Sequence, residues 1–403
     1  MESDFTPVLR FIALSDVHYQ DEHSVERERM QQALHTAYRI ADSHPSYQNL
    51  DAVCVVGDFA TRGSEIQFQA FKQTLDEGLR SGTKTILALA SHEYMGGGPE
   101  PAQEKLRRVF GQEPDMHEII NGFHFISLSP SKGTEFDQAK RDWVAMELAR
   151  AAENDPQKPI FFFQHPHITG TVFGSIIWGE WDLYPILMHY PQVINFSGHS
   201  HASVNDPRSI HQEHFTCLGT GTLHYFELDE FDKHCGTIPP DGKQAAQMLI
   251  VEADAAGCVR IVPYDLISNS PFSFADGSIE WEIDHPSEPE RFRYTNTKRR
   301  AAAKAPWFPE SAGFRVEGNV LTFNQAVAPQ EYVNDYLVRV RNSHGRIIRQ
   351  AALWSDYYLV PMPETCSVGL GSLAPGEYSI EITARGFWDN KSENQLLGSF
   401  TVT

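Results

Sequence analysis

Residues 193–201, V-I-N-F-S-G-H-S-H, decide the fold. The apolar run at 193–196 predicts a buried strand, and Gly198 allows a sharp turn where that strand ends. His199 and His201 follow two residues apart, so their side chains point the same way in extended backbone. Neutral imidazole is the commonest metal-binding side chain. Alone, the stretch fits either one side of a metal site or a turn that carries two surface histidines.

Four further apolar runs end in the same kind of residue. They are 9–14 before Asp16 and His18, 51–56 before Asp58, 85–90 before Ser91 and His92, and 159–163 before His165. Helical spacing at 24–43 and 65–80 separates the first three runs, which predicts strand–helix–strand units and a parallel core sheet. Because α/β sheets bind ligands at the carboxyl ends of their strands, we expect these side chains to meet at one edge.

The collected side chains suit a site for two metal ions. Two ions about 3.5–4 Å apart need a bridging carboxylate and imidazole and oxygen ligands on both sides. Asp58, on an early central strand, is the natural bridge. The remaining ligands divide into Asp16, His18 and His201 for one ion and His165 and His199 for the other. This donor mixture favours Mn, Fe or Zn and disfavours Cu(I) or Mg.

The blocks D-x-H, G-D, S-H-E, H and G-H-x-H, in this order, resemble those of the calcineurin-like metallophosphoesterase superfamily. The resemblance covers residues 11–201 directly and extends to about residue 270. It implies an α/β fold, a four-layer α/β/β/α sandwich of two facing mixed sheets, with a two-metal centre and the ligand roles given above. His92 would steady or protonate the leaving-group oxygen. Cyclic-nucleotide phosphodiesterases of bacteria and relatives of purple acid phosphatases are more similar than protein phosphatases.

One block departs from the superfamily pattern. Its G-N-H is Ala90-Ser91-His92 here, so Ser91 stands where an asparagine oxygen binds the second ion. A serine hydroxyl is neutral and shorter than an amide side chain, so it is a poorer ligand. The sequence therefore predicts one firmly held and one weakly held ion.

Several other residues leave two interpretations open. His167, like His224, fits a pocket residue that contacts phosphate or an ordinary loop histidine. Arg62 fits a phosphate clamp, as in the related protein phosphatases, or a structural salt bridge, because Thr61 replaces the aspartate of their motif. The segment 169–181 is rich in aromatic residues and glycine and suits a lid. The aromatic residues Trp178, Trp181 and Tyr94 fit either a lid or the core.

The chain changes character after residue 270. Residues 271–305 are proline-rich and predict a connector between a domain at 1–270 and a smaller domain at 306–403. Short alternating runs broken by Gly, Pro and Asn predict an all-β sandwich there. Residues 373–384 resemble the tyrosine-corner region of fibronectin type III domains, so the second domain is expected to be of fibronectin type III or immunoglobulin type.

Composition limits the partners. The formal charge of −20, from 33 Lys and Arg against 53 Asp and Glu, disfavours a nucleic acid polymer or an anionic membrane as partner. The first ten residues lack the layout of a signal peptide, so a cytoplasmic protein is expected unless a leader has been removed. Five dispersed cysteines predict reduced thiols: Cys54, Cys217, Cys235, Cys258 and Cys366.

These observations predict a metal-dependent hydrolase of a small phosphodiester, such as a cyclic nucleotide, or of a phosphomonoester. Asp58 and His92 would be the catalytic residues, and His92, Arg62 and His167 would contact substrate. The alternative is a binding protein with a weakened metal site, whose sandwich domain contacts a cell-surface or carbohydrate partner. Ser91 favours this alternative and the rest of the ligand set opposes it. The partner of the sandwich domain cannot be identified from the sequence.

Overall fold

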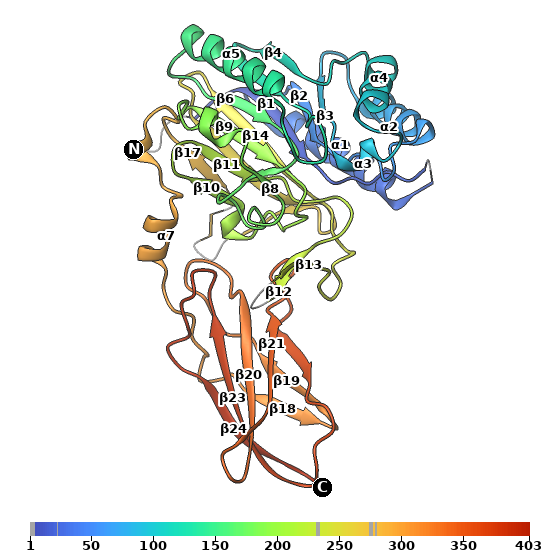
Figure 1. Cartoon of the computed structure of the whole chain (residues 1–403). Coiled ribbons are helices and arrows are strands. Elements are labelled where there is room, and N and C mark those ends of the chain that lie inside the picture. Colours follow the sequence, from blue (N-terminus) through green and yellow to red (C-terminus); the bar gives the residue numbers. More distant parts are fainter. Residues whose placement is uncertain (1–4, 22, 231–233, 274–276, 279) are drawn as a thin grey trace. The chain divides into compact units, whose positions relative to one another are not determined.

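A computed structural model of the chain describes residues 5–21, 23–230, 234–273, 277–278 and 280–403. The described residues form two compact units (Figure 1). The first unit comprises those within 1–229, 235–272 and 279–296. The second comprises those within 230–234, 273–278 and 297–403.

The first sheet of the first unit has the strand order β16-β15-β14-β1-β2-β3, and β17 also pairs with β15. Its strands are β1 (Pro7–Leu14), β2 (Ala52–Val56), β3 (Lys84–Ala88), β14 (Gln247–Asp254), β15 (Val259–Asp265), β16 (Ser270–Pro271) and β17 (Trp281–Ile283). Strands β1, β2 and β3 are parallel, whereas β14 runs antiparallel to β1. The carboxyl ends of the first three strands therefore share one edge.

The second sheet has the order β10-β11-β9-β6-β5-β4. Its strands are β4 (Met116–Ile120), β5 (Phe123–Ser127), β6 (Ile160–Phe163), β9 (Val193–Ser197), β10 (Ile210–Gln212) and β11 (Thr216–Gly219). The four central strands are parallel, and β4 and β10 are antiparallel edges. Every residue of β6 and β9 is buried, as the apolar sequence predicts.

Helices cover the outer face of each sheet (Figure 1). They are α1 (Val25–Ser43), α2 (Glu65–Gly78), α3 (Ser91–Tyr94), α4 (Pro99–Phe110), α5 (Gln138–Asn154) and α6 (Tyr184–Leu187). On the first sheet, Met30 and Leu34 of α1 share a core cluster with Val53 of β2. On the second sheet, Val144 of α5 shares a cluster with Phe162 of β6.

The inner faces of the two sheets meet through aromatic side chains. The ring of Phe11 on β1 lies 4.9–6.0 Å, centroid to centroid, from four rings of the second sheet: Phe125, Phe161, Phe163 and Phe196. Helix, sheet, sheet and helix therefore stack as four layers. The predicted α/β fold class is confirmed.

Short elements complete the described chain outside the sandwich domain. They are β7 (His167–Ile168), β8 (Gly179–Glu180), η1 (Pro207–Ser209), β12 (Leu228–Glu230), β13 (His234–Thr237), η2 (Pro289–Arg291) and α7 (Asn296–Ala302). β7 pairs with β8, and β12 pairs with β13.

The second unit contains an all-β sandwich, as predicted. One sheet has the order β18-β19-β22 and the other β21-β20-β23-β24. The strands are β18 (Phe314–Glu317), β19 (Val320–Asn324), β20 (Asp335–Asn342), β21 (Ile347–Trp354), β22 (Thr365–Gly369), β23 (Gly376–Arg385) and β24 (Leu396–Val402). Leu321 and Phe323 of one sheet share a core cluster with Val338 and Ile380 of the other. Tyr378 donates its hydroxyl to the carbonyl of Ala374 at 2.6 Å, a bond of the tyrosine-corner type.

The range 271–305, predicted to be a loop-like connector, contains regular structure. Strand β17 pairs with β15 of the first sheet, and Trp281 and Ile283 are buried. The alternation W-E-I is too short to stand out in a proline-rich segment, so sequence patterning missed it. The first unit accordingly reaches residue 296.

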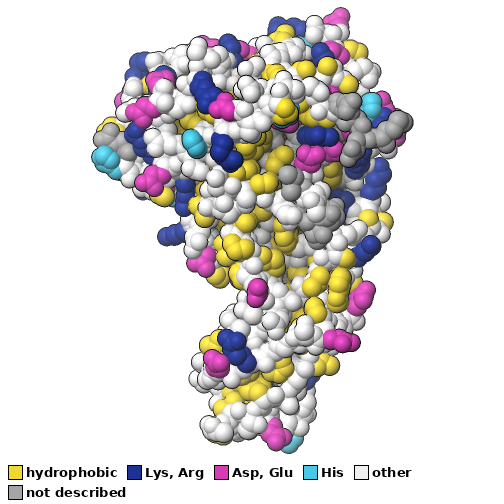
Figure 2. Space-filling view, turned by 180° about the vertical axis from the view of Figure 1, so that it is seen from behind, with side chains coloured by type: hydrophobic (Ala, Val, Ile, Leu, Met, Phe, Trp, Pro, Cys, Tyr) yellow, Lys and Arg dark blue, Asp and Glu magenta, His cyan; other side chains and the backbone are white. Residues whose placement is uncertain are grey.

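The described cysteines Cys54, Cys217, Cys258 and Cys366 are free, and the first, second and fourth are buried. The side chain of Cys235 lies outside the described residues. Within the described ranges, no helix is long and apolar enough to cross a membrane. Acidic, basic and apolar side chains are interspersed on the face in Figure 2.

Candidate metal centre

The predicted ligands lie at the carboxyl ends of strands from both sheets. Asp16 and His18 follow β1, Asp58 follows β2, His165 follows β6, and His199 and His201 follow β9. Their potential ligand atoms form three groups, each within 4.8 Å: Asp16, His18 and His201; Asp58, His165 and His199; and His18, Asp58 and His92. Asp58 shares one group with His165 and His199 and another with His18, which also groups with Asp16 and His201. Asp58 therefore lies next to ligands expected for both ions, as a bridging carboxylate requires.

The Oδ1 atom of Asp16 faces three imidazoles. It lies 3.2 Å from Nε2 of His201, 3.8 Å from Nε2 of His165 and 3.9 Å from Nε2 of His18. Within the described part of the chain, this buried oxygen accepts no hydrogen bond. A buried carboxylate oxygen needs a partner, and a cation held by the same imidazoles would supply one.

Asp58 uses its two oxygens differently. Oδ2 lies 3.0 Å from Nε2 of His165, and Oδ1 accepts the backbone N–H of His92 at 2.9 Å. The hydroxyl of Ser91 lies 3.5 Å from Oδ2, at the limit of a hydrogen bond. Ser91 thus lies beside Asp58, the carboxylate that the sequence predicts to be the bridge.

Backbone carbonyls fix the orientation of three imidazoles. Nδ1 of His165 donates to the carbonyl of Val56 at 2.7 Å, and Nδ1 of His201 donates to that of Tyr225 at 2.8 Å. Nδ1 of His92 donates to the carbonyl of Thr61 at 2.8 Å. A carbonyl only accepts, so each bond places the ring hydrogen on Nδ1. In the neutral ring this leaves the Nε2 lone pair for another partner, as in histidines that bind metal.

Two nitrogen–nitrogen contacts also fit ligands that share a cation. Nε2 of His18 lies 3.1 Å from Nε2 of His201, and Nε2 of His165 lies 3.2 Å from Nδ1 of His199. In their neutral forms, with the hydrogen on Nδ1, His201 and His165 would present Nε2 lone pairs to a cation. Imidazoles converging on one cation would show the same proximity.

The backbone of the ligands is strained. Asp16, His18, Asp58, His199 and His201 all have φ between 49° and 73°, in the left-handed region. Residues other than glycine rarely occupy this region, and such strain concentrates at functional sites. Two glycines keep space for the cluster. A Cβ atom on Gly57 would lie 2.7 Å from Nδ1 of His165, and one on Gly198 would lie 2.6 Å from Oδ2 of Asp16.

The carboxylates are ionised in spite of their burial. Burial opposes charge on Asp16 and Asp58, but the neighbouring imidazoles outweigh it and hold both pKa values below the usual range. Burial also opposes charge on His165, yet Asp58 and Asp16 raise its pKa to about 10. Without metal, a proton on His165 therefore balances part of the negative charge that a cation would balance.

His167 is the predicted site residue that the structure does not bring into these groups. It is buried, with Nδ1 2.7 Å from the hydroxyl of Ser197 and Nε2 2.8 Å from that of Ser200. Burial lowers its pKa to about 3, so the ring is neutral. Because both nitrogens are bonded within the chain, His167 supports the loop that carries His199 and His201. The substrate contact predicted for it stays a prediction.

Arg62 lies on the loop that His92 contacts. Its side chain is exposed and forms no ion pair with any described residue, so the structure gives no salt bridge of the predicted kind. Its backbone N–H donates to Oε1 of Gln67 at 2.9 Å. The loop is therefore held while the guanidinium group remains available.

Several neighbours of the site carry no sequence motif of their own. The ring of Trp178 meets that of His199 edge-on with centroids 4.9 Å apart, and the ring of Tyr225 lies 4.4 Å from that of His201. The ring of His224 lies 5.2 Å from that of His18, and its Nδ1 lies 2.8 Å from Oε1 of Glu26. The sequence signals for such contacts were the aromatic segment 169–181 and the two interpretations left open for His224.

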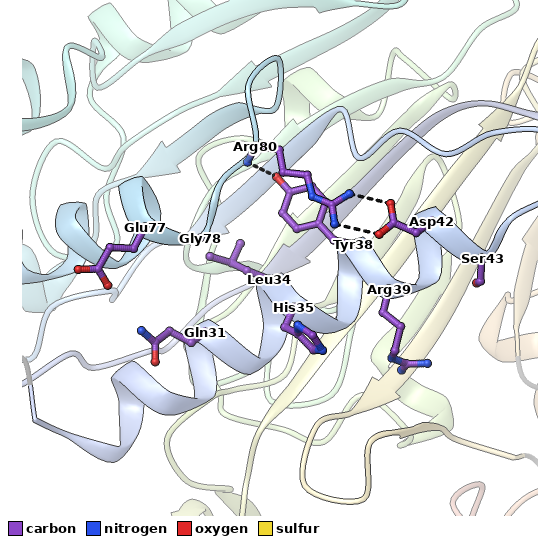
Figure 3. A pocket seen from close by; sticks show the side chains of 10 residues that line it. All are labelled: Gln31, Leu34, His35, Tyr38, Arg39, Asp42, Ser43, Glu77, Gly78 and Arg80. Atoms are coloured by element: carbon purple, nitrogen blue, oxygen red, sulfur yellow. Dashed lines mark hydrogen bonds and ion pairs between the residues drawn. The ribbon is translucent and has the colours of Figure 1, made fainter.

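A separate hollow of 730 Å³ lies along α1 and the end of α2 (Figure 3). Arg80 in its lining makes two hydrogen bonds to Asp42, of 2.6 and 2.8 Å. The guanidinium group also lies 4.3 Å from the ring centroid of Tyr38. Since its charge is already balanced and no candidate metal ligand lines the hollow, we do not assign the chemistry to it.

No protein-family model and no curated protein matches this chain. Among solved structures, the purple acid phosphatase PPD1 from yellow lupin (Lupinus luteus) seeds is 13% identical. The match covers 68% of this chain and 53% of the lupin chain, with a TM-score of 0.46. This chain thus spans about half the length of the lupin protein.

Two further structures match at lower similarity. Phosphopantetheinyl hydrolase from Mycobacterium tuberculosis is 13% identical over 53% of this chain and 89% of its own, with a TM-score of 0.31. A segment of two fibronectin type III domains from chicken tenascin is 15% identical over 42% and 78%, with a TM-score of 0.19. These similarities are remote, so a functional proposal has to rest on the side chains of this chain.

Proposed function

We propose that the chain is a metal-dependent phosphoester hydrolase with a two-ion centre. The observation that carries the proposal is that Asp58 groups with His165 and His199 and also with His18, which in turn groups with Asp16 and His201. Asp16, His18 and His201 would hold one ion, and His165 and His199 the other. Two such ions acidify a bound water and neutralise charge on phosphoryl oxygens.

The donor set fits Mn, Fe or Zn, because imidazole and carboxylate are mixed on both sides. Neutral imidazoles can present Nε2 of His165 and of His201 to an ion, since their Nδ1 hydrogens are already donated to carbonyls. The short hydroxyl of Ser91 leaves the second ion with one weak ligand. One ion should therefore be held more loosely than the other.

His92 is placed to serve the leaving group. Its backbone N–H is bonded to Asp58 and its Nδ1 hydrogen to Thr61, so ring position and tautomer are both fixed. Its other nitrogen, Nε2, can carry a proton toward a leaving-group oxygen. This geometry supports a role as hydrogen-bond donor or acid on the phosphoester.

The substrate we propose is a small phosphodiester or phosphomonoester. Arg62 offers an exposed guanidinium on a loop bonded to His92, and such a group binds phosphate oxygens in pairs. The strongly acidic chain would repel a nucleic acid polymer. Arg62 would thus bind the phosphoryl group of a compact ester.

Hydrolysis of two chromogenic esters tests the proposal. Wild-type protein with added Mn²⁺ should hydrolyse bis-p-nitrophenyl phosphate or p-nitrophenyl phosphate, and a chelator should abolish the reaction. His92→Gln should lower kcat by about 10²–10⁴-fold, the usual contribution of general acid–base groups, with metal content unchanged. Protein that binds Mn²⁺ but hydrolyses neither ester would instead support the alternative of a metal-binding protein without catalytic function.

A further inference from the structure

Glu93 is a fully buried carboxylate for which the proposed chemistry has no role. Its Oε2 accepts the backbone N–H groups of Asp58 at 3.1 Å and of Ala90 at 2.9 Å, and its Oε1 accepts that of Ala60 at 2.8 Å. The carboxylate therefore ties together the two loops that follow β2 and β3.

Each of the two loops supplies a carboxyl group that accepts a backbone N–H of the other loop. Glu93, from the second loop, accepts the N–H of Asp58, and Asp58, from the first loop, accepts the N–H of His92 at 2.9 Å. The N–H of Asp58 points to Glu93 while φ of Asp58 is 49°, an unfavourable value for a residue with a side chain. Glu93 thus stabilises the strained backbone from which the bridging carboxylate projects.

Helix capping explains only part of this arrangement. The bond from Ala90, three residues before Glu93, is that of a capping box. Helix α3, however, has four residues, and the other two bonds come from residues 58 and 60, outside it. A cap for so short a helix does not require a fully buried carboxyl group beside Asp58.

The backbone of Glu93 is closely packed as well. A Cβ atom on Gly63 would lie 2.6 Å from the carbonyl carbon of Glu93, so the loop of Arg62 packs against its backbone. The ammonium group of Lys105 donates to the carbonyl of Gly63 and, at 3.3 Å, to that of Gly96. In the described chain Glu93 forms no ion pair, so its bonds to N–H groups are what hold it.

We propose that Glu93 is a positioning residue that sets the orientation of Asp58 and thereby the affinity of the more weakly held metal ion. The inference rests on the proposed two-ion site. It follows from the three N–H bonds, because loss of an acceptor would let the left-handed backbone at Asp58 relax and turn the bridging oxygen. Second-layer groups of metal sites typically change affinity or activity by about 10–100-fold.

The test compares Glu93→Gln, Glu93→Asp and a control, Asp265→Asn, in the full-length protein. Glutamine keeps the volume but places an NH₂ group against an N–H donor, and aspartate keeps the carboxyl group but is one methylene shorter. Asp265 is also a buried carboxyl group that accepts a backbone N–H, that of Ser268 at 2.6 Å, and it supplies no metal ligand. Mn²⁺ binding is followed by electron paramagnetic resonance of free Mn²⁺, and melting temperature is measured without metal.

Glu93→Gln should bind the weaker Mn²⁺ about 10-fold or more less tightly, with Glu93→Asp between it and wild type. Asp265→Asn should lower the melting temperature while Mn²⁺ affinity stays within about 2-fold. Glu93→Gln could instead bind two Mn²⁺ like wild type and differ only by a lower melting temperature. Glu93 would then be a structural cap, and the inference would be wrong. If Glu93→Gln does not fold, the same criterion is applied to Glu93→Asp. Because the readout is binding, it remains decisive if wild type hydrolyses no ester. Wild-type protein that binds no Mn²⁺ overturns the proposed function and this inference together.

Discussion

Oδ2 of Asp58 lies 3.0 Å from Nε2 of His165, while Oδ1 of the same carboxylate accepts the N–H of His92 at 2.9 Å. One oxygen therefore faces the candidate metal ligands and the other anchors the side chain. His165 belongs to one group of three ligands, whereas Asp58 belongs to two. Replacing Asp58 and replacing His165 should therefore differ in the number of metal ions that the protein loses.

Asp58→Asn should lose both metal ions, whereas His165→Ala should lose one. Asparagine preserves the acceptor for the N–H of His92 but removes the negative charge. Because Asp58 would be shared by both ions, we expect the affinity for Mn²⁺ to fall by about 100-fold or more. Elemental analysis of protein loaded with Mn²⁺ and desalted measures the number of ions per chain. Two ions retained in Asp58→Asn would contradict the assignment of Asp58 as the bridge.

Ser91→Asn should tighten the weaker ion. The serine hydroxyl lies 3.5 Å from Oδ2 of Asp58, and an amide oxygen at this position reaches one bond further. We expect about a 10-fold gain in affinity for the second Mn²⁺ and a matching rise in diester hydrolysis at limiting metal. Ser91→Ala is the control and should bind no better than wild type. Equal affinity in Ser91→Asn and wild type would show that Ser91 is a sufficient ligand or has no role.

The ligand cluster could be predicted from sequence because each of its motifs directly follows an apolar strand. Asp16, Asp58 and His199 need no knowledge of distant contacts, since parallel strands bring their carboxyl ends together. The sandwich was predictable for a similar reason, because alternation and turns are local signals.

Residues whose roles depend on contacts across loops could not be assigned in this way. Glu93 stands in a recognised block, but its bonds to Asp58 and Ala60 span more than thirty residues and follow no period. The sequence likewise does not show that the two nitrogens of His167 lie against the hydroxyls of Ser197 and Ser200. Register and loop packing, which one sequence does not specify, decide both cases.

His167 and Ser200 should be energetically coupled. Within the described chain the hydroxyl of Ser197 donates to the carbonyl of Leu218 at 3.3 Å, so it accepts the hydrogen on Nδ1 of His167. The hydroxyl of Ser200 donates to Nε2 of the same ring. Removing either partner leaves a buried polar group unsatisfied, at a cost of about 1–3 kcal/mol. In a double-mutant cycle of His167→Ala and Ser200→Ala, losses of unfolding free energy should therefore be less than additive by about 0.5–3 kcal/mol. Additive losses would show that the 2.8 Å bond contributes nothing to stability.

Glu180 should make stability depend on pH. Its side chain is buried, with 5% exposed. Oε2 accepts the backbone N–H of Leu183 at 3.1 Å and that of Asp182. Oε1 accepts no hydrogen bond from the described residues. Burial raises its pKa to about 8 from an ordinary value of 4.5, although the two N–H groups oppose the shift. Between these values the folded chain keeps a proton that the unfolded chain loses. Unfolding free energy should consequently fall as pH rises from about 4.5 to 8, by at most about 1.4 kcal/mol per unit.

Glu180→Gln removes this titration while keeping an oxygen acceptor for the two N–H groups. Melting temperatures of metal-free wild type and variant, compared at pH 5, 6.5 and 8, isolate the contribution of Glu180 because other groups titrate alike in both. Wild type should be more stable relative to the variant at pH 5 than at pH 8. Parallel melting curves across this range would mean that Glu180 is ionised in the folded protein and that its unpaired oxygen finds a partner.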